Sequence, residues 1–398
     1  MKILQINSVC GYGSTGRIAT DLYKLLEKQG HDCVIAYGRG SAPKGIRTIK
    51  IGSKFDNYTH VAQTRLFDTH GFGSIKATKE FIKKAKEYDP DVIHLHNIHG
   101  YYINIKLLFN YLKEIQKPVV WTLHDCWSFT GHCSHFDYIG CDKWKEGCFK
   151  CPQKRSYPKS FFLDNSKNNY RRKNELFNEL KNMTLVTPSK WLANLVKESF
   201  LGDYNIKVIN NGINLEKFKP LLSNFRRKNN LDDKFIILGV ASVWDTRKGF
   251  DSFLELSKCI EKNDQIVLVG LNDKQLKDLP KNITGIKRTN NIEELAEIYS
   301  TADGFVNPTL QDNFPTTNLE SLACGTPVIT FNTGGSVESI DQSCGLIVEK
   351  ESIKGLVEAI SRIKIKSFSK SNCLKMASQF DMNDRFNEYI KLYKKVMK

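Results

Sequence analysis

Short apolar runs alternate with amphipathic segments over the first 200 residues of the chain. The segment 17–30 places its leucine and isoleucine side chains on one helical face and ends in a glycine, which is typical of an amphipathic helix. Five apolar runs have the length of buried strands: residues 2–7, 33–38, 91–96, 118–124 and 185–189. This alternation predicts a parallel sheet covered by helices.

The same alternation begins again near Phe235. The expected strands are residues 235–242, 265–270, 304–308, 327–330 and 345–348, and the clearest helices are residues 291–302 and 316–325. Between the halves, residues 206–220 contain an Asn-Asn-Gly turn and end in a proline, which suits a connection between domains. We therefore expect a first domain over residues 1–210, a second over 211–376, and a C-terminal helix over 377–398 that returns to the first domain. Two doubly wound α/β domains would bind ligands in a cleft at the carboxyl ends of their strands.

Length and charge narrow the classes of protein. A chain of 398 residues suits two domains rather than one. Its start lacks a secretory h-region, and no apolar run reaches the roughly 18 residues of a membrane span, so we expect a cytoplasmic protein. The net charge of +16 has four alternative interpretations: a solvated lysine-rich surface, or attraction to an anionic membrane leaflet, to an anionic substrate or to nucleic acid. The basic segment 168–182 is interpreted as an exposed helix with Leu176, Phe177 and Leu180 facing inward, and we expect no nucleic-acid partner.

Cysteines are concentrated in one segment. Five of the eleven cysteines lie in the cysteine-rich segment 126–152, and a chain without an export signal is not expected to use them as a disulfide framework. This segment looks too polar and too poor in aromatic residues to form a core of its own, so a structural zinc ion would fold it and present Trp127 and Phe129 to a substrate. Free or oxidised thiols and a redox pair are alternatives, and His132 or His135 could replace a thiol. The four candidate ligands are Cys133, Cys141, Cys148 and Cys151.

The sequence DNFPTTNLE, from Asp312 to Glu320, places two carboxylates eight positions apart around an expected helix start. Pro315 suits the beginning of a helix, because its missing N–H costs nothing there. The backbone N–H groups that follow, with the hydroxyls of Thr316 and Thr317, would form an anion site suited to a diphosphate. The alternative is purely structural: a turn at the first carboxylate and a capping box between Thr317 and Glu320.

Two further motifs suggest chemistry but are weak alone. Residues 11–16 match G-x-G-x-x-G between a strand and a helix, although the next strand ends without the acidic residue of a dinucleotide site. Arg39 could instead face a 2′-phosphate, so an NADP-dependent oxidoreductase stays an alternative. The D-x-D of Asp89 and Asp91 precedes its strand and is interpreted as a turn.

Histidines and an aspartate follow two of the expected strands. His94 and His96 alternate on one strand and therefore point the same way. His94 is equally well a core histidine, whereas His96 lies nearer the carboxyl end. His124 and Asp125 end the next strand and suit binding of an acceptor.

Four stretches together resemble family 4 retaining glycosyltransferases of the two-domain GT-B type. They are GYGSTGRIATDLYKLLEKQGHD, VINNGINLEKFKP, RKGFDSFLEL and, most specifically, the stretch from Ala302 to Gly335. Through LHDCWSFTGHC the chain looks most like enzymes that build bacterial capsule, exopolysaccharide or colanic-acid-type chains. The resemblance implies two Rossmann-like domains, the first for the acceptor and the second for the donor.

The resemblance also implies roles for residues. Lys248 would bind the donor diphosphate, with Arg247 replacing an arginine that many members carry where this chain has Ser242. Asp312 stands where the family has a glutamate that contacts sugar hydroxyls, and Glu320 would contact the ribose. His96 would lie beside the transferred sugar. The remaining residues implied for the donor are Gly13, Asn313, Phe314, Pro315, Thr316 and Thr317, and those for the acceptor are Gly16, His124 and Asp125.

The activity so implied is transfer of one sugar, with retention at the anomeric carbon, from a nucleotide diphosphate sugar such as a UDP- or GDP-sugar. The acceptor would be a growing polysaccharide or a lipid-linked glycan, reached at the inner face of the plasma membrane. No cofactor is expected for catalysis. The sequence offers no evident side-chain nucleophile, which favours front-face displacement over a two-carboxylate double displacement. The alternatives are the NADP-dependent oxidoreductase and a basic protein that binds anionic surfaces or nucleic acid.

Overall fold

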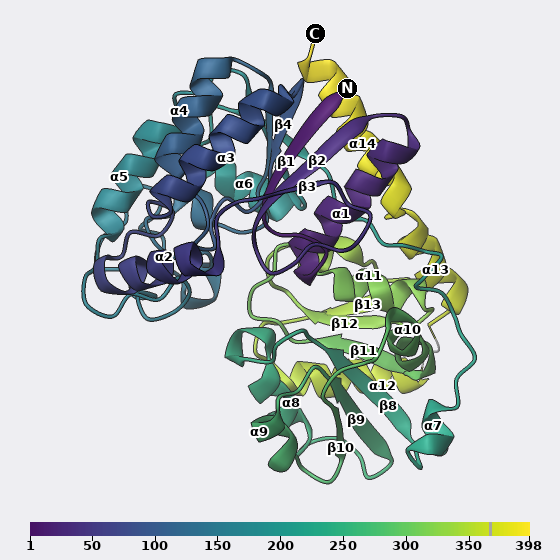
Figure 1. Cartoon of the computed structure of the whole chain (residues 1–398). Coiled ribbons are helices and arrows are strands. Elements are labelled where there is room, and N and C mark those ends of the chain that lie inside the picture. The colour runs from purple at the N-terminus through teal and green to yellow at the C-terminus, as the bar shows by residue number, and fades with distance from the viewer. Residues whose placement is uncertain (366–367) are drawn as a thin grey trace. The chain divides into compact units, whose positions relative to one another are not determined.

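The computed structural model of the protein describes residues 1–365 and 368–398. These residues form two compact units, each built on one parallel sheet with helices packed around it (Figure 1). Unit 1 comprises Met1–Ile209 and Phe386–Lys398, and unit 2 comprises Asn210–Arg385. The prediction of two doubly wound α/β folds is confirmed.

Unit 1 contains a seven-stranded sheet in the order β3-β2-β1-β4-β5-β6-β7, and every pairing is parallel. Its central strands are buried on both faces, which explains their continuous apolar sequences. The strands are β1 (Lys2–Val9), β2 (Asp32–Arg39), β3 (Thr48–Lys50), β4 (Val92–Leu95), β5 (Val119–Thr122), β6 (Met183–Thr187) and β7 (Asn205–Val208).

The helices of unit 1 cover both faces of its sheet. Figure 1 shows α3, α4 and α5 on one side of β1 and β4, and α1 and α14 on the other. The helices are α1 (Gly13–Lys28), α2 (Lys54–Phe67), α3 (Ile75–Tyr88), α4 (Ile105–Ile115), α5 (Ser166–Phe177), α6 (Lys190–Glu198), α14 (Met382–Val396), and the 3₁₀ turns η1 (Trp127–Phe129) and η2 (Asp137–Ile139).

Helix α1 begins at Gly13, four residues before the start expected from the apolar pattern. The second half of the glycine-rich motif is therefore the first turn of the helix rather than a loop. Leu22, Tyr23 and Leu26 are buried on its inner face, in agreement with the predicted amphipathic pattern.

The last helix, α14, packs on the sheet of unit 1, as expected. Its Tyr393 hydroxyl lies 2.6 Å from Nδ1 of His94, and its Tyr389 hydroxyl accepts a hydrogen bond of 3.1 Å from Thr122. Both tyrosines are buried, so the C-terminus of the chain completes the core of the unit that contains the N-terminus.

Unit 2 contains a six-stranded parallel sheet in the order β10-β9-β8-β11-β12-β13. Its strands are β8 (Phe235–Val240), β9 (Asp264–Val269), β10 (Ile283–Ile286), β11 (Gly304–Asn307), β12 (Val328–Phe331) and β13 (Gly345–Val348). Its helices are α7 (Phe225–Lys228), α8 (Phe250–Leu256), α9 (Asp273–Lys277), α10 (Ile292–Thr301), α11 (Thr316–Ala323), α12 (Ile353–Ile365), α13 (Lys370–Ser378), and the 3₁₀ turns η3 (Thr246–Lys248) and η4 (Ser336–Ser339). The segment expected as one terminal helix after residue 376 thus contains the end of α13, a break and α14.

Two segments at the ends of unit 2 pair with each other. Ile213 donates its N–H to Phe380 O at 2.8 Å and accepts from Met382 N at 3.0 Å, forming an isolated parallel bridge. A Cβ at Gly212 would lie 2.5 Å from the Cα of Met382, so only glycine allows this approach. The Asn-Asn-Gly sequence therefore serves close packing as well as the connection.

In the part of the chain that the structure describes, no helix combines the length and the apolar character that crossing a bilayer requires.

Candidate functional site

Each sheet has a switch point, where two neighbouring strands lead into helices on opposite sides. In unit 1 it lies between β1 and β4, and in unit 2 between β8 and β11. Ligands of doubly wound folds bind beyond the carboxyl ends of such strands. Most of the residues singled out from the sequence follow these strands or their direct neighbours.

In unit 2 the basic pair Arg247 and Lys248 lies in η3, on the connection that follows β8. Asp245 caps this turn by accepting the Lys248 N–H at 2.8 Å. The Arg247 guanidinium donates to Gln311 O at 3.0 Å, and Leu310 N donates to Arg247 O at 2.8 Å. These bonds join the loop after β8 to the loop after β11.

The second connection at the unit 2 switch point carries Asp312, whose carboxylate makes an ion pair with the Lys248 ammonium. The backbone carbonyl of Asp312 accepts from Gly335 N at 3.1 Å. A side chain at Gly334, which has φ of 52°, would collide with this carbonyl. Bonds to the backbone therefore fix the loops after β8 and β11. Lys248 on the first loop and Asp312 on the second pair with each other.

Helix α11 begins directly after this loop. Pro315, not Thr317, is its N-cap residue and makes no side-chain cap hydrogen bond, so the alternative of a capping box between Thr317 and Glu320 is wrong. Glu320 is buried instead, where it accepts from the Tyr299 hydroxyl at 3.1 Å and from Thr316 Oγ1 at 3.4 Å. The start of α11, where a proline is the N-cap residue, carries the positive end of the helix dipole and suits an anion.

The other residues expected for the donor have different surroundings. Phe314 is buried in the core of unit 2, where its ring lies 5.5 Å from that of Phe380 and its carbonyl accepts from Asn211 Nδ2. Its side chain thus shapes the loop from beneath. Asn313 and Thr317 are partly exposed on either side of Pro315.

In unit 1, His96 follows β4 and is fully buried. Its Nε2 lies 3.0 Å from Oε1 of Gln5 and its Nδ1 lies 3.1 Å from Nε2 of His124. Since the Gln5 oxygen can only accept, Nε2 of His96 carries the hydrogen and Nδ1 accepts from His124. Burial lowers the pKa of His96 well below its usual value and that of His124 to about 4, so both imidazoles are neutral.

Asp125 belongs to a second polar group beside these rings, which the sequence analysis missed. Its Oδ2 lies 2.9 Å from Nε2 of His99, and Nδ1 of His99 lies 3.0 Å from the Tyr157 hydroxyl. Its Oδ1 accepts the Trp127 N–H at 2.9 Å. Burial alone would raise the pKa of Asp125, but His99 and these hydrogen bonds outweigh it and hold the pKa at about 2.

A small pocket brings the histidines and Asp125 together at the carboxyl ends of β4 and β5. Its lining includes His96, His99, His124, Asp125 and Trp127. His99 lies only three positions after His96, so its nearness to the strand end was a usable signal. Tyr157 offered none, because it comes from a distant loop.

The glycine-rich connection after β1 lies at the same switch point. Gly13 has φ of 65° and open space where a side chain would stand, which leaves room for a ligand to approach its backbone. Gly16 is buried, and a Cβ there would press on Val9 and on the backbone of Gly11, so its place is in helix packing. The Asp89 and Asp91 pair is a turn, as expected: Asp89 is the left-handed C-cap of α3, and Asp91 accepts from Lys2 N at 2.7 Å.

The cysteine-rich segment has a core, so the expectation that it lacks one is wrong. Phe129, Phe136 and Trp144 are buried, and the rings of Phe136 and Trp144 stack with centroids 5.0 Å apart. Aromatic residues spaced irregularly in a loop give no periodic signal, which is why this cluster was missed. All cysteines of the described residues are free thiols.

Lys173 corrects the interpretation of the basic segment 168–182 as an exposed helix. It is fully buried on α5, where its ammonium donates to Trp127 O at 2.5 Å and lies 3.9 Å from the centroid of the Trp127 rings. Phe177 and Leu180 face inward as expected. The buried lysine fixes the turn that follows Asp125.

Two family models match the chain. The model described as Glycosyltransferase Family 4 covers residues 15–217, and the model described as Glycosyl transferases group 1 covers residues 234–364. The chain is therefore a glycosyltransferase. This finding excludes the alternative of an NADP-dependent oxidoreductase, which the glycine-rich motif by itself also allowed.

Curated relatives agree with these models. The chain is 28% identical over 382 residues, 90% of each chain, to the putative colanic acid biosynthesis glycosyl transferase WcaC of Escherichia coli (strain K12). It is 30% identical over 204 residues to the N,N′-diacetylbacillosaminyl-diphospho-undecaprenol alpha-1,3-N-acetylgalactosaminyltransferase of Campylobacter jejuni, covering 47% of this chain and 53% of the relative.

Solved structures share the whole fold. The sucrose-phosphate synthase of Thermosynechococcus elongatus superimposes with a TM-score of 0.72 at 17% identity, covering 99% of this chain and 98% of the other. Anabaena HepE, solved in complex with UDP, superimposes with a TM-score of 0.71 at 16% identity, covering 99% and 100%. Sequence motifs, two switch-point sheets and both family models lead to one conclusion: this chain is a member of glycosyltransferase family 4, with the GT-B fold.

Proposed function

We propose that the protein transfers a sugar from a nucleotide diphosphate sugar, UDP- or GDP-linked, to a growing cell-surface polysaccharide or a lipid-linked oligosaccharide, with retention at the anomeric carbon. The observation that carries this proposal is the ion pair of Lys248 and Asp312 at the switch point of unit 2, in the loop that leads into the start of α11 at Pro315. The named activities of the Campylobacter relative and of the Escherichia coli UDP-Gal:alpha-D-GlcNAc-diphosphoundecaprenol alpha-1,3-galactosyltransferase, 26% identical over 221 residues, support the acceptor class.

The donor half of the proposal assigns the diphosphate to Lys248, Arg247 and the first turn of α11. An ammonium has three N–H donors, and within residues 1–365 and 368–398 the Lys248 ammonium forms an ion pair with one carboxylate, that of Asp312. A diphosphate would accept hydrogen bonds from the remaining N–H donors. The ammonium would then stabilise the negative charge that develops on the leaving diphosphate. Asp312 then faces the hydroxyls of the transferred sugar, and buried Glu320 holds the ribose.

The acceptor half assigns the polar pocket of unit 1 to the incoming hydroxyl. Asp125 is ionised and oriented by His99, so it is a fixed hydrogen-bond acceptor. His96 and His124 are neutral and joined in one chain of hydrogen bonds, which suits contact with sugar hydroxyls rather than with phosphate. Gly13 has open space beside its backbone, which leaves room for a ligand at the loop after β1.

Retention follows in this proposal from front-face displacement. The acceptor oxygen forms its bond to the anomeric carbon on the side from which the diphosphate departs, and a leaving phosphate oxygen takes the acceptor proton. The bond from the anomeric carbon to the phosphate oxygen breaks, so one nucleoside diphosphate is released for each sugar transferred. Cationic Lys248 and Arg247 lower the cost of that departure.

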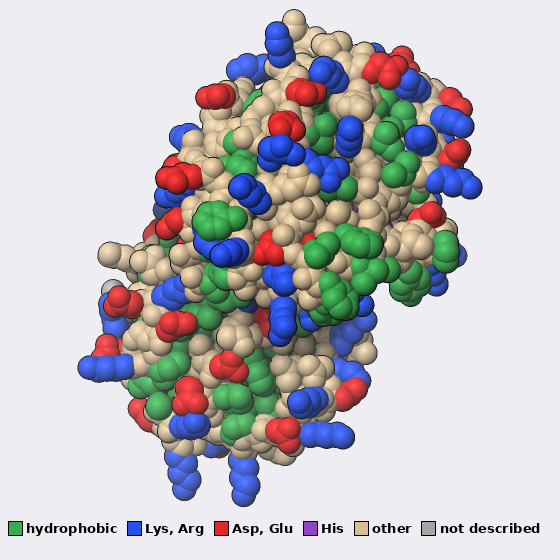
Figure 2. All heavy atoms as spheres, turned by 90° about the vertical axis from the view of Figure 1, so that its left-hand side faces the viewer, with side chains coloured by type: hydrophobic (Ala, Val, Ile, Leu, Met, Phe, Trp, Pro, Cys, Tyr) green, Lys and Arg blue, Asp and Glu red, His purple; other side chains and the backbone are tan. Residues whose placement is uncertain are grey.

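Unit 1 also has a surface suited to an anionic bilayer. Phe55 and Tyr58 of α2 are 74% and 70% exposed, and Phe162 is 70% exposed. The two segments are adjacent, since Phe161 N donates to Arg65 O at 2.9 Å and the Arg65 guanidinium lies 5.8 Å from the Phe161 ring. Figure 2 shows hydrophobic side chains gathered on one face among lysines and arginines. Exposed aromatic residues with a net charge of +16 suit reversible binding to anionic lipid, where a lipid-linked acceptor would be found.

The test begins with melting temperatures of the purified chain against UDP, GDP, ADP and CMP, because a bound nucleotide raises apparent stability. The nucleotide that stabilises the chain then selects the sugar donors for assays with undecaprenyl-diphosphate-linked sugars. The anomeric configuration of the product is read from its NMR coupling constant. Inversion at the anomeric carbon would overturn the proposed mechanism, and absence of any stabilising nucleoside diphosphate would overturn the donor class.

A further inference from the structure

Four thiols of the cysteine-rich segment line one small cavity in unit 1. Cys133, Cys141, Cys148 and Cys151 all contribute to its wall, and the free space accommodates about one water-sized sphere, 10 Å³. We propose that this cavity is a structural zinc site in which the four thiolates bind one Zn²⁺ with no open coordination position. Four cysteines are a ligand set that zinc prefers, and a closed set marks a structural site.

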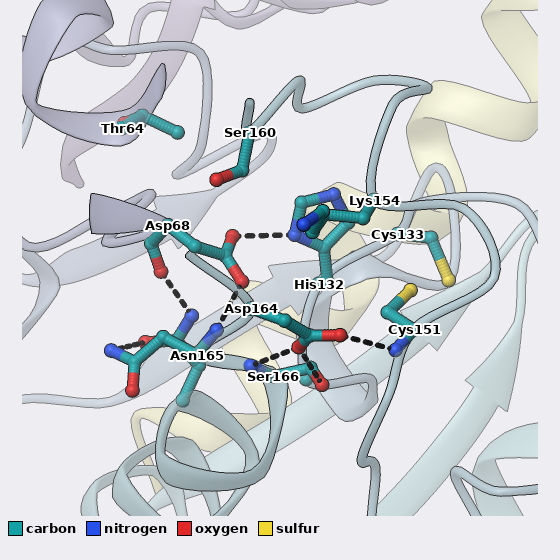
Figure 3. A network of polar contacts seen from close by, with 12 residues as sticks. Thr64, Asp68, His132, Cys133, Cys151, Lys154, Ser160, Asp164, Asn165 and Ser166 are labelled. Atoms are coloured by element: carbon teal, nitrogen blue, oxygen red, sulfur yellow. Dashed lines mark hydrogen bonds and ion pairs between the residues drawn. The ribbon is translucent and has the colours of Figure 1, made fainter. Parts of the chain in front are cut away.

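Three of the sulfur atoms already have defined partners. The side chains of Cys133 and Cys151 face each other, and Figure 3 shows their sulfur atoms turned toward one another. Cys148 Sγ accepts the Gly131 N–H at 3.1 Å. Cys148 and Cys151 form a Cys-x-x-Cys pair, so two ligands come from one turn.

The wall of the cavity holds a donor that negative sulfur would satisfy. Trp144 lines the cavity and is 1% exposed, and its Nε1 has no hydrogen-bond partner among the described residues. A buried N–H without a partner costs free energy, whereas a metal-bound thiolate is a strong acceptor. The backbone is also fixed, because Cys151 N donates to Asp164 Oδ2 at 2.6 Å, as Figure 3 shows.

Charge balance supports a tetrathiolate. Four thiols that bind Zn²⁺ release four protons and leave a site with two net negative charges. The ammonium of Lys143 lines the cavity and is held there by the carbonyls of Phe149 and Lys150, each at 3.2 Å.

Binding requires the four side chains to close around the cavity. Within residues 1–365 and 368–398, no three His, Cys, Asp or Glu side chains already stand in an arrangement that holds a metal ion. Cys141 and Cys151 are partly exposed and give the ion a path of entry. Neither His132 nor His135 lines the cavity, and Nδ1 of His132 is committed to Asp68 at 2.5 Å (Figure 3), so the thiols are the ligands.

The site would hold the segment that orients Asp125. Thr130 Oγ1 donates to the carbonyl of Cys133 at 2.5 Å, and Cys126 N donates to Ser134 O at 3.1 Å. The turn between these bonds contains Trp127, whose N–H binds Asp125. Zinc thereby ties the loop after β5 to the rest of unit 1, and it takes no part in the transfer itself.

The test measures metal in the full chain, purified under reducing conditions without chelator. Elemental analysis should find about one zinc per chain, and titration with a thiol-modifying mercurial should release it. Cys141→Ser and Cys148→Ser should each lose most of the zinc. Cys259→Ser, which changes an exposed cysteine of unit 2, should keep it. Zinc content unchanged in Cys148→Ser would overturn the ligand set.

Replacement of zinc by Co²⁺ provides a readout that does not depend on variants that fold poorly. The wild-type chain should show sulfur-to-cobalt charge-transfer bands and the strong d–d bands of a tetrahedral site. An octahedral cobalt spectrum, or a metal-free chain with a Cys133–Cys151 disulfide in mass spectrometry, would overturn the proposal. Because neither measurement uses donor or acceptor, the result is independent of the proposed transferase activity.

Discussion

The ammonium of Lys248 pairs with the carboxylate of Asp312, 64 positions later in the chain, where the loops after β8 and β11 meet in unit 2. The opposite charges of the two side chains offset each other in this ion pair. A diphosphate that binds Lys248 would weaken this pair and release Asp312 to accept hydrogen bonds from a sugar. Under the proposed function, binding of the diphosphate at Lys248 would thereby be linked to binding of the sugar at Asp312.

Lys248→Ala should reduce turnover by about 10²-fold or more, because it removes a preorganised positive charge from the departing diphosphate. Steady-state kinetics with the donor identified by thermal shift measures this loss. Lys258→Ala provides the matched control, since Lys258 is exposed on the same unit and pairs with Glu255 at its surface. Near-wild-type turnover of the Lys248 variant would remove the phosphate site from this loop.

Glu320→Gln should weaken nucleotide binding by roughly tenfold, because a neutral amide is a poorer acceptor for ribose hydroxyls than a carboxylate. Calorimetric titration with the nucleoside diphosphate measures the change. Tyr299→Phe removes the hydroxyl that binds Glu320 but keeps the carboxylate, so it should have a smaller effect. Equal losses in both variants would indicate that Glu320 acts only through packing.

Asp125→Asn should lower turnover with acceptor by about 10²-fold and leave nucleotide affinity unchanged, since Asp125 belongs to the polar pocket of unit 1. Turnover and calorimetry together separate the two effects. The control is Asp89→Asn, which changes a carboxylate that is 72% exposed and paired with Lys117. A loss of nucleotide affinity in the Asp125 variant would contradict its assignment to the acceptor.

Acid should destabilise unit 1 through His94. Burial lowers the pKa of His94 to about 3, so its neutral form is the one that the fold accepts. The unfolded chain takes up a proton below pH 6.5, and stability that is complete above this value is lost progressively as the pH falls toward 3. At pH 5.5 the loss from His94 alone is on the order of 1 kcal/mol.

Urea unfolding followed by tryptophan fluorescence at several pH values checks this dependence. His94→Gln should be less stable than the wild type at pH 7.5 but should lose less stability on acidification. Tyr393→Phe removes the neighbouring hydroxyl and keeps the imidazole, so it should retain the wild-type slope. An unchanged pH slope in the His94 variant would show that other groups cause the acid sensitivity.

Replacing both Phe55 and Phe162 by serine should reduce partitioning to phosphatidylglycerol-rich vesicles at least tenfold, because each exposed ring adds apolar area at the bilayer interface. Co-sedimentation at low and at physiological salt measures binding. Leu222→Ser, at a fully exposed position of unit 2, is the control for general surface hydrophobicity. Equal binding of wild type to neutral and anionic vesicles would contradict the electrostatic part of the proposal.

The sequence predicted the central strands of both sheets, because strands buried on both faces are continuous apolar runs. The three strands that it missed, β3, β7 and β10, are all sheet edges. Edge strands bury fewer of their side chains than central strands do, and in β7 three of the four residues are exposed. Their sequences therefore carry no apolar run from which a strand could be predicted.

The candidate site was predictable where its residues follow strands and not where distant loops contribute. Lys248, Asp312, His96 and Asp125 follow the ends of strands, so their neighbourhood follows from topology. Tyr157 reaches His99 from 58 positions away, and no local pattern announces such a contact. The burial of Lys173 could not be predicted for a related reason. A basic residue on a helix is expected to face solvent, and the turn at Trp127 that buries Lys173 is distant in the sequence.

The bridge between Ile213 and Asp381 brings the first and last segments of unit 2 together. Unit 2 begins and ends on two strands of chain that lie side by side, so it is topologically an insertion into unit 1. Neighbouring termini are the condition under which a domain can be excised or transplanted. Unit 2 should therefore be separable from unit 1 near the Ile213–Asp381 bridge, with α14 kept in unit 1, and a short linker could then join the two parts of unit 1 into one continuous chain.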